Sequence, residues 1–459
     1  MNDAHNIVAN VPSRSNPARP PGPKGSPLMG VMRDFNRDQL GFIEHCRHEY
    51  GDIVWMRFLY VPALFLYHPD DIEYVLVTNA KNFIKSMSLR SNFFQRLVGN
   101  GLLTSQGEEW KRQRRLSQPA FHRERVASYG QVMVAYANRL TAKWQNGENR
   151  DVHPDMMRLT LEIVVQCLFS ADVSNDVDDV GATLKELVKP FAAQATLGWI
   201  LNNRLPTPAH LRFHALARKI DNVVYRIISE RRASGEDKGD LLSMLLAARD
   251  EDGSQMNDRQ LRDEVMTSFL AGHETTALTL AWSWYLLGDH PEVEKKFHAE
   301  LDEVLGGRTP TIADLSRLKY TEQMAKESMR LYPPAFGLGR EAIDDCEIGG
   351  YRVPAGTQVF MFQWATHRDP RFYDEPAAFR PERWTEDFIE QLPKYAYFPF
   401  GGGPRVCIGA SFAMMEVILC LATIGQKFRL ELDQDHPVSI YPAMSLRPKD
   451  GIKVVIRNR

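Results

Sequence analysis

The spacing of apolar and polar positions divides the chain into three portions. Short apolar runs within residues 53–77 are bounded by turn-forming residues and predict strands. Longer apolar segments in residues 106–331 predict a series of helices, interrupted by the prolines at 206–208 and by the charged stretch 231–240. After Pro333 the pattern predicts strands again, as far as the C-terminus.

Helical and strand-like portions are therefore segregated along the chain. This arrangement favours a mostly α class with smaller β portions (α+β) over repeated βα units. Residues 1–30 are polar and then rich in proline and glycine, so they predict an N-terminal arm laid on the body of the protein. We expect residues 31–459 to form a single large domain. Glycine motifs for dinucleotides or nucleoside triphosphates do not occur in the sequence.

The charge balance and the length of the apolar stretches exclude several classes of protein. Lys and Arg number 56 and Asp and Glu 58, and the resulting net charge of −2 argues against a dedicated nucleic-acid binder. The longest charge-free stretch, 353–367, is shorter than the ~18 residues of a spanning helix, so we expect no membrane-spanning segment. Residues 1–30 contain no apolar secretory segment. We therefore expect a cytoplasmic protein, and peripheral contact with a membrane stays open.

One cysteine has unusual surroundings. The chain has an odd number of widely spaced cysteines and no CxxC pair, which argues against a disulfide framework. Cys407 closes a glycine-rich segment, residues 400–409, just before the apolar helix predicted from Ala410. A helix N-terminus favours an anion, so we expect a lowered pKa for the Cys407 thiol. The glycines allow close approach of a flat ligand. The alternative role is that of a buried structural cysteine, as expected for the others: Cys46, Cys167, Cys346 and Cys420.

The loop around Cys407 matches Phe-x-x-Gly-x-Arg-x-Cys-x-Gly from Phe400 to Gly409. It resembles the haem-binding loop of the cytochrome P-450 family. The resemblance implies a single large cytochrome P-450 haem-domain fold, haem b (iron protoporphyrin IX) as cofactor, and Cys407 as the thiolate ligand of the iron.

Two further segments resemble the same family in the expected order. Glu327 and Arg330 have i, i+3 spacing, and an ordinary helix ion pair of this kind contributes only ~0.2–0.5 kcal/mol. Pro381-Glu-Arg383-Trp384 follows. In the family the later arginine joins the pair in a buried triad behind the haem loop. Trp384 stands where the family usually has Phe, a conservative departure that leaves the structural role intact.

The segment Ala271-Gly-His-Glu274-Thr275-Thr276 lies in an apolar helix. Glycine and β-branched residues are poor helix formers, so a weakened, distorted turn is expected, and threonine hydroxyls that bond back to carbonyls are the alternative role. The segment resembles the oxygen-binding groove of the family. By that resemblance Glu274 and Thr275 are the catalytic residues and relay the protons that reduction of dioxygen requires.

The cofactor carboxylates have candidate partners. Trp110 and Arg114 share one helix face and resemble the family's Trp-x-x-x-Arg, which holds the haem propionates. Arg340 and Arg405 match two further propionate contacts. We assign no ligand role to three histidines: His122, His273 and His367.

The resemblance implies a monooxygenase that inserts one atom of O2 into a lipophilic substrate, as in soluble bacterial members of the microsomal-like branch. We expect a fatty acid, alkane or terpenoid-like substrate. Too few residues follow Cys407 for a flavin domain, so the electron donor is external: a ferredoxin or flavodoxin with its reductase, or a diflavin reductase. A basic face of Lys111, Arg112 and Arg115 either presents positive charge to this partner or is a solvated helix face. We expect a monomer.

The expected substrate pocket is apolar, and two other function classes stay open. Lys85 or Arg90 could anchor a substrate carboxylate. One alternative is a haem-thiolate enzyme that uses or rearranges a peroxide, and another is a haem-binding sensor or electron-transfer protein. The segments that line the pocket in the family contribute these residues: Phe94, Leu97, Phe269, Ala271, Phe336, Leu338 and Met444.

Overall fold

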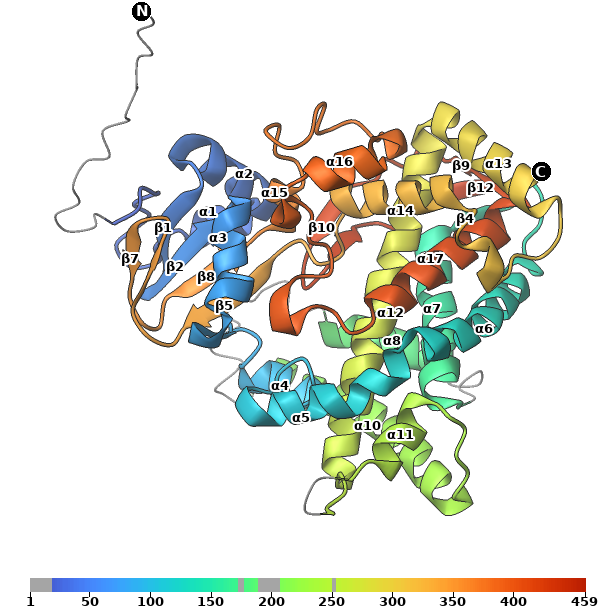
Figure 1. The fold of residues 1–459 in the computed structure, drawn as a ribbon, viewed down its shortest axis with the longest axis horizontal. Helices are drawn as coiled ribbons and strands as arrows, with labels where there is room; N and C mark the ends of the chain where they lie inside the picture. The colour runs from blue at the N-terminus through green and yellow to red at the C-terminus, as the bar shows by residue number, and fades with distance from the viewer. Residues whose placement is uncertain (1–18, 172–176, 189–206, 250–252) are drawn as a thin grey trace, which may run out of the picture.

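The computed structural model describes residues 19–171, 177–188, 207–249 and 253–459, and helices dominate it (Figure 1). The mostly α prediction with smaller β portions is confirmed. In chain order the described α-helices are α1 (Met32–Arg37), α2 (Gln39–Tyr50), α3 (Pro69–Glu73), α4 (Asn92–Val98), α5 (Gly107–Ser117), α6 (Arg123–Thr141), α7 (Val152–Phe169), α8 (Val177–Val188), α10 (Pro208–Ser234), α11 (Leu241–Ala247), α12 (Asp258–Asp289), α13 (Pro291–Leu305), α14 (Lys319–Leu331), α15 (Gln363–Thr366), α16 (Glu386–Gln391) and α17 (Ala410–Gly425).

The strands gather mainly in one five-stranded sheet of order β1-β2-β8-β5-β3. Strand β2 pairs with β8 in parallel, and the other neighbours in this sheet are antiparallel. A three-stranded sheet of order β4-β12-β9 and the hairpins β6–β7 and β10–β11 complete the β structure. The strands are β1 (Ile53–Phe58), β2 (Val61–Leu66), β3 (Phe83–Lys85), β4 (Asn149–Asp151), β5 (Leu338–Ala342), β6 (Cys346–Ile348), β7 (Tyr351–Val353), β8 (Gln358–Met361), β9 (Phe428–Leu432), β10 (Ile440–Pro442), β11 (Leu446–Pro448) and β12 (Lys453–Asn458).

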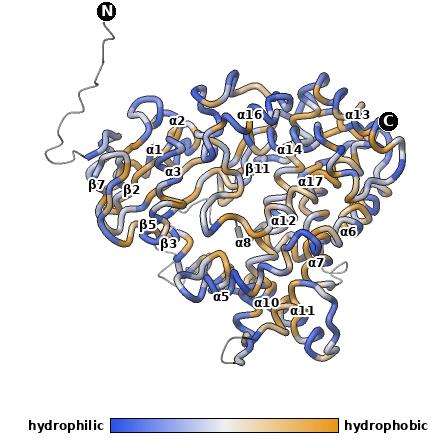
Figure 2. Tube along the Cα trace, viewed as in Figure 1, coloured by the Kyte–Doolittle hydropathy of each residue, from blue (hydrophilic) through white to orange (hydrophobic). Residues whose placement is uncertain are grey.

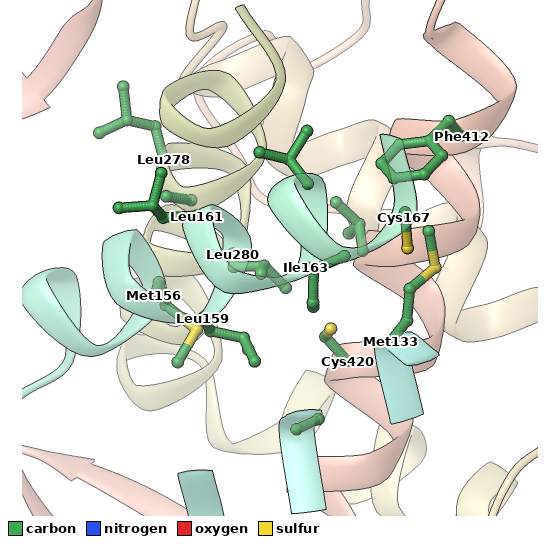
Figure 3. Packing of buried hydrophobic residues seen from close by; sticks show 14 of the residues in the cluster. Met133, Met156, Leu159, Leu161, Ile163, Cys167, Leu278, Leu280, Phe412 and Cys420 are labelled. Atoms are coloured by element: carbon green, nitrogen blue, oxygen red, sulfur yellow. The ribbon is translucent and has the colours of Figure 1, made fainter. Parts of the chain in front are cut away.

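Helix α12 runs through the centre of the helical portion and packs against α7 and α17 (Figure 1). Hydrophobic residues gather along α12 and α17, and hydrophilic residues along the outer turns (Figure 2). Figure 3 shows side chains of α6, α7, α12 and α17 interleaved in the largest core cluster. Gly272 allows the close approach of α7, because a Cβ there would lie 2.6 Å from Val164 Cγ2.

Several boundaries differ from the sequence prediction. Pro208 begins α10 behind the N-cap residue Thr207, whereas Pro206 lies outside the described residues. The stretch 231–240 is only partly an interruption, because α10 continues to Ser234. Arg231 forms a buried ion pair with Asp240 at 2.8 Å, which anchors the stretch in the core.

The described part of the arm, residues 19–30, lies along β1. The Trp55 N–H donates to Pro21 O at 2.9 Å, and the Leu59 N–H donates to Met29 O at 3.1 Å. The guanidinium of Arg57 donates to Pro27 O at 2.8 Å. Within the described ranges, no helix is both long enough and apolar enough to cross a bilayer.

Candidate functional site

The glycine-rich loop turns tightly ahead of α17 and presents Cys407 three residues before the helix. Gly403 has φ +65°, and a Cβ on it would lie 1.8 Å from Leu76 O, so only glycine fits. The Cys407 N–H donates to Phe400 O at 2.9 Å and closes the loop. Arg114 of α5 donates from Nη1 to Val406 O at 2.8 Å and holds the loop from outside.

The Cys407 side chain is exposed at the surface of the described structure, although protein surrounds it closely. It is solvent-accessible, yet surrounding protein raises the pKa of its thiol. The Gly409 N–H and the Arg114 charge act in the opposite direction, as expected at a helix N-terminus, but burial outweighs them. The predicted lowering of the Cys407 pKa is therefore wrong for this chain by itself. A thiolate here requires a cationic partner such as a metal ion.

Helix α12 carries an accessible stripe in its otherwise buried middle. Ala271 and Thr275 are exposed, and Ser268 and Gly272 are partly exposed, whereas most neighbouring positions are buried. These positions share one helix face, so the stripe is one accessible face of α12. The helix continues without a break through this segment, and the expected distortion of the turn stays a prediction. The Thr275 hydroxyl donates to Ala271 O at 2.8 Å, as the alternative role of this residue predicted.

Glu274 points away from that stripe. Its side chain is 3% exposed, and its Oε1 accepts from Arg447 Nε at 2.7 Å. Ser445 Oγ and Arg447 Nη2 donate to the same oxygen. No hydrogen bond joins the side chains of Glu274 and Thr275 in the described structure, although the two residues are neighbours in the sequence.

A cluster of cations lies beside the loop. Lys85 and Arg340 are cross-strand partners in β3 and β5, and both are buried. Burial, then the charges of Arg340 and Arg405, hold the pKa of Lys85 well below its usual range. Burial lowers the pKa of Arg340 to about 10, and burial with Arg340 lowers that of Arg405 to about 10. The Arg405 guanidinium lies 4.4 Å from the centre of the Trp110 ring.

The described residues supply no carboxylate to this cluster. Arg405 donates from Nη2 to Ser105 O at 3.1 Å and to Gln106 Oε1 at 2.9 Å, and its buried Nη1 has no partner in the described structure. Buried cations require an opposite charge. The cluster therefore fits a ligand with carboxylate groups. Sequence reasoning missed Lys85 as a member of it, although its place opposite Arg340 follows from strand pairing.

Arg90 and Lys85 do not form a free anchor for a substrate carboxylate. Arg90, in the segment between β3 and α4, is paired with Glu341 of β5. Lys85 belongs to the cation cluster.

The pair Glu327 and Arg330 is fully buried and part of a network. Arg330 donates to Glu327 from Nε at 2.8 Å and from Nη2 at 2.9 Å, and Arg383 Nε donates to it at 2.8 Å. The Trp384 indole N–H adds a bond to Glu327 Oε2 at 2.9 Å. A phenylalanine could not make this bond, so the departure from the family motif adds a donor. The structure excludes a solvated surface pair here.

The three histidines occupy structural positions. His367 is buried and accepts from the Phe398 N–H at Nε2, 3.0 Å away. His273 is buried with Nδ1 2.9 Å from Phe269 O. His122 is exposed at the N-cap of α6.

A cavity of about 640 Å³ opens between the large sheet, α4 and the tip of the β10–β11 hairpin. Four of the expected pocket residues line it: Phe94, Phe336, Leu338 and Met444. Leu97 and Phe269 belong to the main core and do not line this cavity, and Ala271 belongs to the stripe of α12.

The expected basic face of α5 is partly neutralised. Lys111 is paired with Glu108 at 2.5 Å, and Arg112 and Arg115 also have interactions. Val406, next to Cys407, is 37% exposed and brings an apolar side chain to the surface.

A family model described as Cytochrome P450 matches residues 20–456, so the chain belongs to the cytochrome P450 family. "Cyclooctatin synthase" of Streptomyces melanosporofaciens is 37% identical over 427 residues, which cover 92% of each chain. "Pentalenene oxygenase" of Streptomyces avermitilis is 34% identical over 424 residues, covering 91% of this chain and 92% of that protein. The crystal structure of the cytochrome P450DA heme domain aligns with a TM-score of 0.87 at 29% identity, covering 97% of this chain and 98% of that one.

Membership in this family makes the protein a haem-iron oxidoreductase of the monooxygenase type, with a substrate, O2 and a redox partner. The accessible thiol, the cation cluster without a carboxylate and the glycine-lined loop fit this cofactor.

Proposed function

We propose that this protein is a haem b monooxygenase that oxidises a terpenoid-like lipophilic substrate with electrons from a separate donor. The observation that carries the proposal is the cation cluster without a counter-ion beside the accessible thiol of Cys407. When bound, thiolate-ligated haem supplies the activation of dioxygen.

The residues on two elements would hold the cofactor. Cys407 would supply the sulfur ligand of the iron. Arg340, Arg405 and the Trp110 indole would hold the carboxylates of the haem, and Lys85 would join them as a fourth donor. Arg114 acts indirectly, because its bond to Val406 O fixes the loop that carries the thiol.

The alcohol and the acid on α12 have separate tasks. The Thr275 hydroxyl donates a hydrogen bond to Ala271 O. Its oxygen lone pairs can therefore accept a hydrogen bond from a donor on the accessible side. We assign Thr275 to the last step of proton delivery and Glu274 to the supply of protons. The arrangement requires Glu274 to leave its contacts with Arg447 and Ser445.

The substrate class is inferred from the cavity and from the relatives. Aromatic and aliphatic side chains dominate the cavity wall, which favours a lipophilic substrate. The pairing of Arg90 with Glu341 disfavours a carboxylate anchor and therefore a fatty acid. Relatives named for cyclooctatin, cyclooctat-9-en-7-ol and pentalenene favour the terpenoid-like option.

The electron donor approaches from the side of the glycine-rich loop. Val406 is exposed there, and α5 lies next to it through the bond from Arg114. A small redox protein or a diflavin reductase fits this role. Because Lys111 of α5 is paired with Glu108, we place the contact with the donor at Val406 and its neighbours and not at a basic patch on α5. A monomeric state and a cytoplasmic location stay predictions.

The test compares two threonines that make the same backbone bond. Thr276 donates to Gly272 O at 3.1 Å as Thr275 does to Ala271 O, but it is buried. Removing a positioned proton-transfer group costs about 10²–10⁴-fold in its step. Thr275→Ala should therefore bind substrate normally but release hydrogen peroxide and form little product per NADPH, whereas Thr276→Ala should keep its coupling. Equal coupling in both variants would remove Thr275 from the mechanism.

The same measurements separate the other function classes. Full product formation from hydrogen peroxide without an electron donor would identify a peroxide-using enzyme. Absence of a substrate-induced spectral shift and of turnover with a panel of terpenes would favour a sensor or an electron-transfer protein.

A further inference from the structure

The Glu274 carboxylate is held by one short segment of the chain. Ser445 Oγ, Arg447 Nε and Arg447 Nη2 all donate to Oε1, and Arg447 Nε also lies 3.2 Å from Ser445 Oγ. Glu274 and Ser445 are nearly inaccessible, and the Arg447 side chain is 14% exposed. A charged pair in such surroundings is weakly screened by water, so the contact is strong enough to fix the carboxylate.

The segment that holds Glu274 also forms part of the substrate cavity. Ser445 and Arg447 belong to the β10–β11 hairpin, whose tip residues Ala443 and Met444 line the cavity wall. Met444 is therefore adjacent in sequence to the serine that contacts Glu274. A ligand that displaces the backbone at Met444 also shifts Ser445, because one peptide bond joins the two residues.

The strand end next to the tip of the same hairpin is fixed. The Leu446 N–H donates to Pro334 O at 3.0 Å, and the Trp282 indole of α12 donates to Leu446 O at 2.9 Å. Displacement at the cavity is therefore confined to the tip and to the two side chains that reach Glu274. The Ala443 N–H donates to Ser445 O at 3.0 Å, so the tip moves as one unit.

We propose that the tip of the β10–β11 hairpin senses the substrate: Ser445 and Arg447 hold Glu274 while the cavity is empty of substrate, and displacement of Met444 by a lipophilic ligand releases the carboxylate for proton supply. The inference rests on the proposed function of Glu274. It makes Ser445 and Arg447 positioning residues, and it couples proton supply to the presence of a substrate. While no substrate is bound, the held carboxylate limits the consumption of NADPH.

The first measurement is hydrogen exchange in the haem-loaded protein, with and without a saturating terpene from the panel above. In the wild type the ligand should increase the exchange of amides in the tip, residues 443–445, and leave that of the fixed Leu446 unchanged. In Arg447→Gln the amides of the hairpin tip should exchange without ligand as fast as they do in the ligand-bound wild type. In Arg447→Lys they should be protected again as in the ligand-free wild type. Arg457→Gln is the matched control, because Arg457 makes an exposed ion pair with Glu431 at 2.8 Å and does not line the cavity.

The second measurement is NADPH consumption without substrate. Coupling between two sites typically changes an equilibrium by roughly 5–150-fold. Arg447→Gln should increase substrate-free consumption by a factor in that range, whereas Arg457→Gln should leave it unchanged. Met444→Ala should bind the terpene but lose the ligand-induced change in exchange. This variant, together with Ser445→Ala, provides the test if Arg447→Gln does not fold.

The outcomes distinguish the inference from the proposed function. If Glu274→Gln keeps the normal product per NADPH, the role of Glu274 itself is wrong. If Glu274→Gln lowers that ratio while neither the terpene in the wild type nor the Arg447 and Ser445 variants change hairpin exchange, the sensor is wrong and proton supply by Glu274 stands.

Discussion

Glu416 provides a sharp test of the energetics of the core. It lies in α17 with 0% exposure, and neither carboxylate oxygen has a hydrogen-bond partner in the described structure. Its neighbourhood includes the thiols of Cys167 and Cys420, which Figure 3 shows in the packing between α7 and α17. Burial raises the pKa of Glu416 well above its ordinary value, so the folded protein holds the neutral acid.

The perturbation is Glu416→Gln, which keeps size and shape and removes the titration. In the unfolded wild-type chain this carboxyl ionises near its ordinary value of 4.5, whereas in the folded chain it stays protonated. The folded state then binds the extra proton, so wild-type stability falls as the pH rises above that value. The slope is about 1.4 kcal/mol per pH unit while the folded group stays neutral.

Between pH 6 and pH 8 the free energy of unfolding of the variant should therefore rise relative to that of the wild type, by at most about 3 kcal/mol, the limit that applies while the folded carboxyl stays neutral. The assay is guanidinium unfolding of the haem-loaded proteins at both pH values, with tryptophan fluorescence as the signal. Glu303→Gln, at an exposed position of α13, controls for the loss of one carboxylate. A stability difference that is equal at pH 6 and pH 8 would refute the reasoning, because it would mean that Glu416 titrates alike in the folded and unfolded chains.

Three further predictions concern the cofactor and its support. Cys407→Ser should abolish the red-shifted Soret band of the reduced carbonyl complex, and survival of that band would exclude the thiolate assignment. Glu327→Ala or Arg330→Ala should give little haem-loaded protein, because breaking a buried ion pair costs ~3–5 kcal/mol; normal yield and haem content would contradict this. Trp384→Phe should lower the free energy of unfolding by ~1.5–3 kcal/mol, since the indole bonds to a charged acceptor, and an unchanged denaturation midpoint would show that this bond contributes nothing.

Sequence patterns predicted the helices and strands whose formation follows from the periodicity of their own residues. Apolar runs gave β1 and β2, and periodic segments gave the long helices, because each pattern matches one periodicity. Strand β4 was not predicted from the sequence. Asn149–Asp151 is a polar tripeptide that forms a strand only by pairing with β12, about 300 residues later.

The candidate site was predictable in its residues and less so in its geometry. The loop motif located Cys407, but the net direction of its pKa shift depends on how much protein surrounds the sulfur, which no local spacing reports. The glycine and threonines in an apolar helix located Glu274, but its partner Arg447 lies 173 positions away. Lys85 looked like an isolated cation until strand pairing placed it opposite Arg340.

The arm along β1 has a consequence for aggregation. Strand β1 is the last strand of the five-stranded sheet, and its outer backbone groups would otherwise be free to pair with another chain. The bonds from Trp55 to Pro21 and from Leu59 to Met29 occupy part of that edge, and the prolines of the arm donate no hydrogen bond outward. Truncation beyond residue 19 would therefore expose unpaired backbone groups on β1 and favour aggregation. Fusion tags are best placed ahead of the arm or at the other terminus.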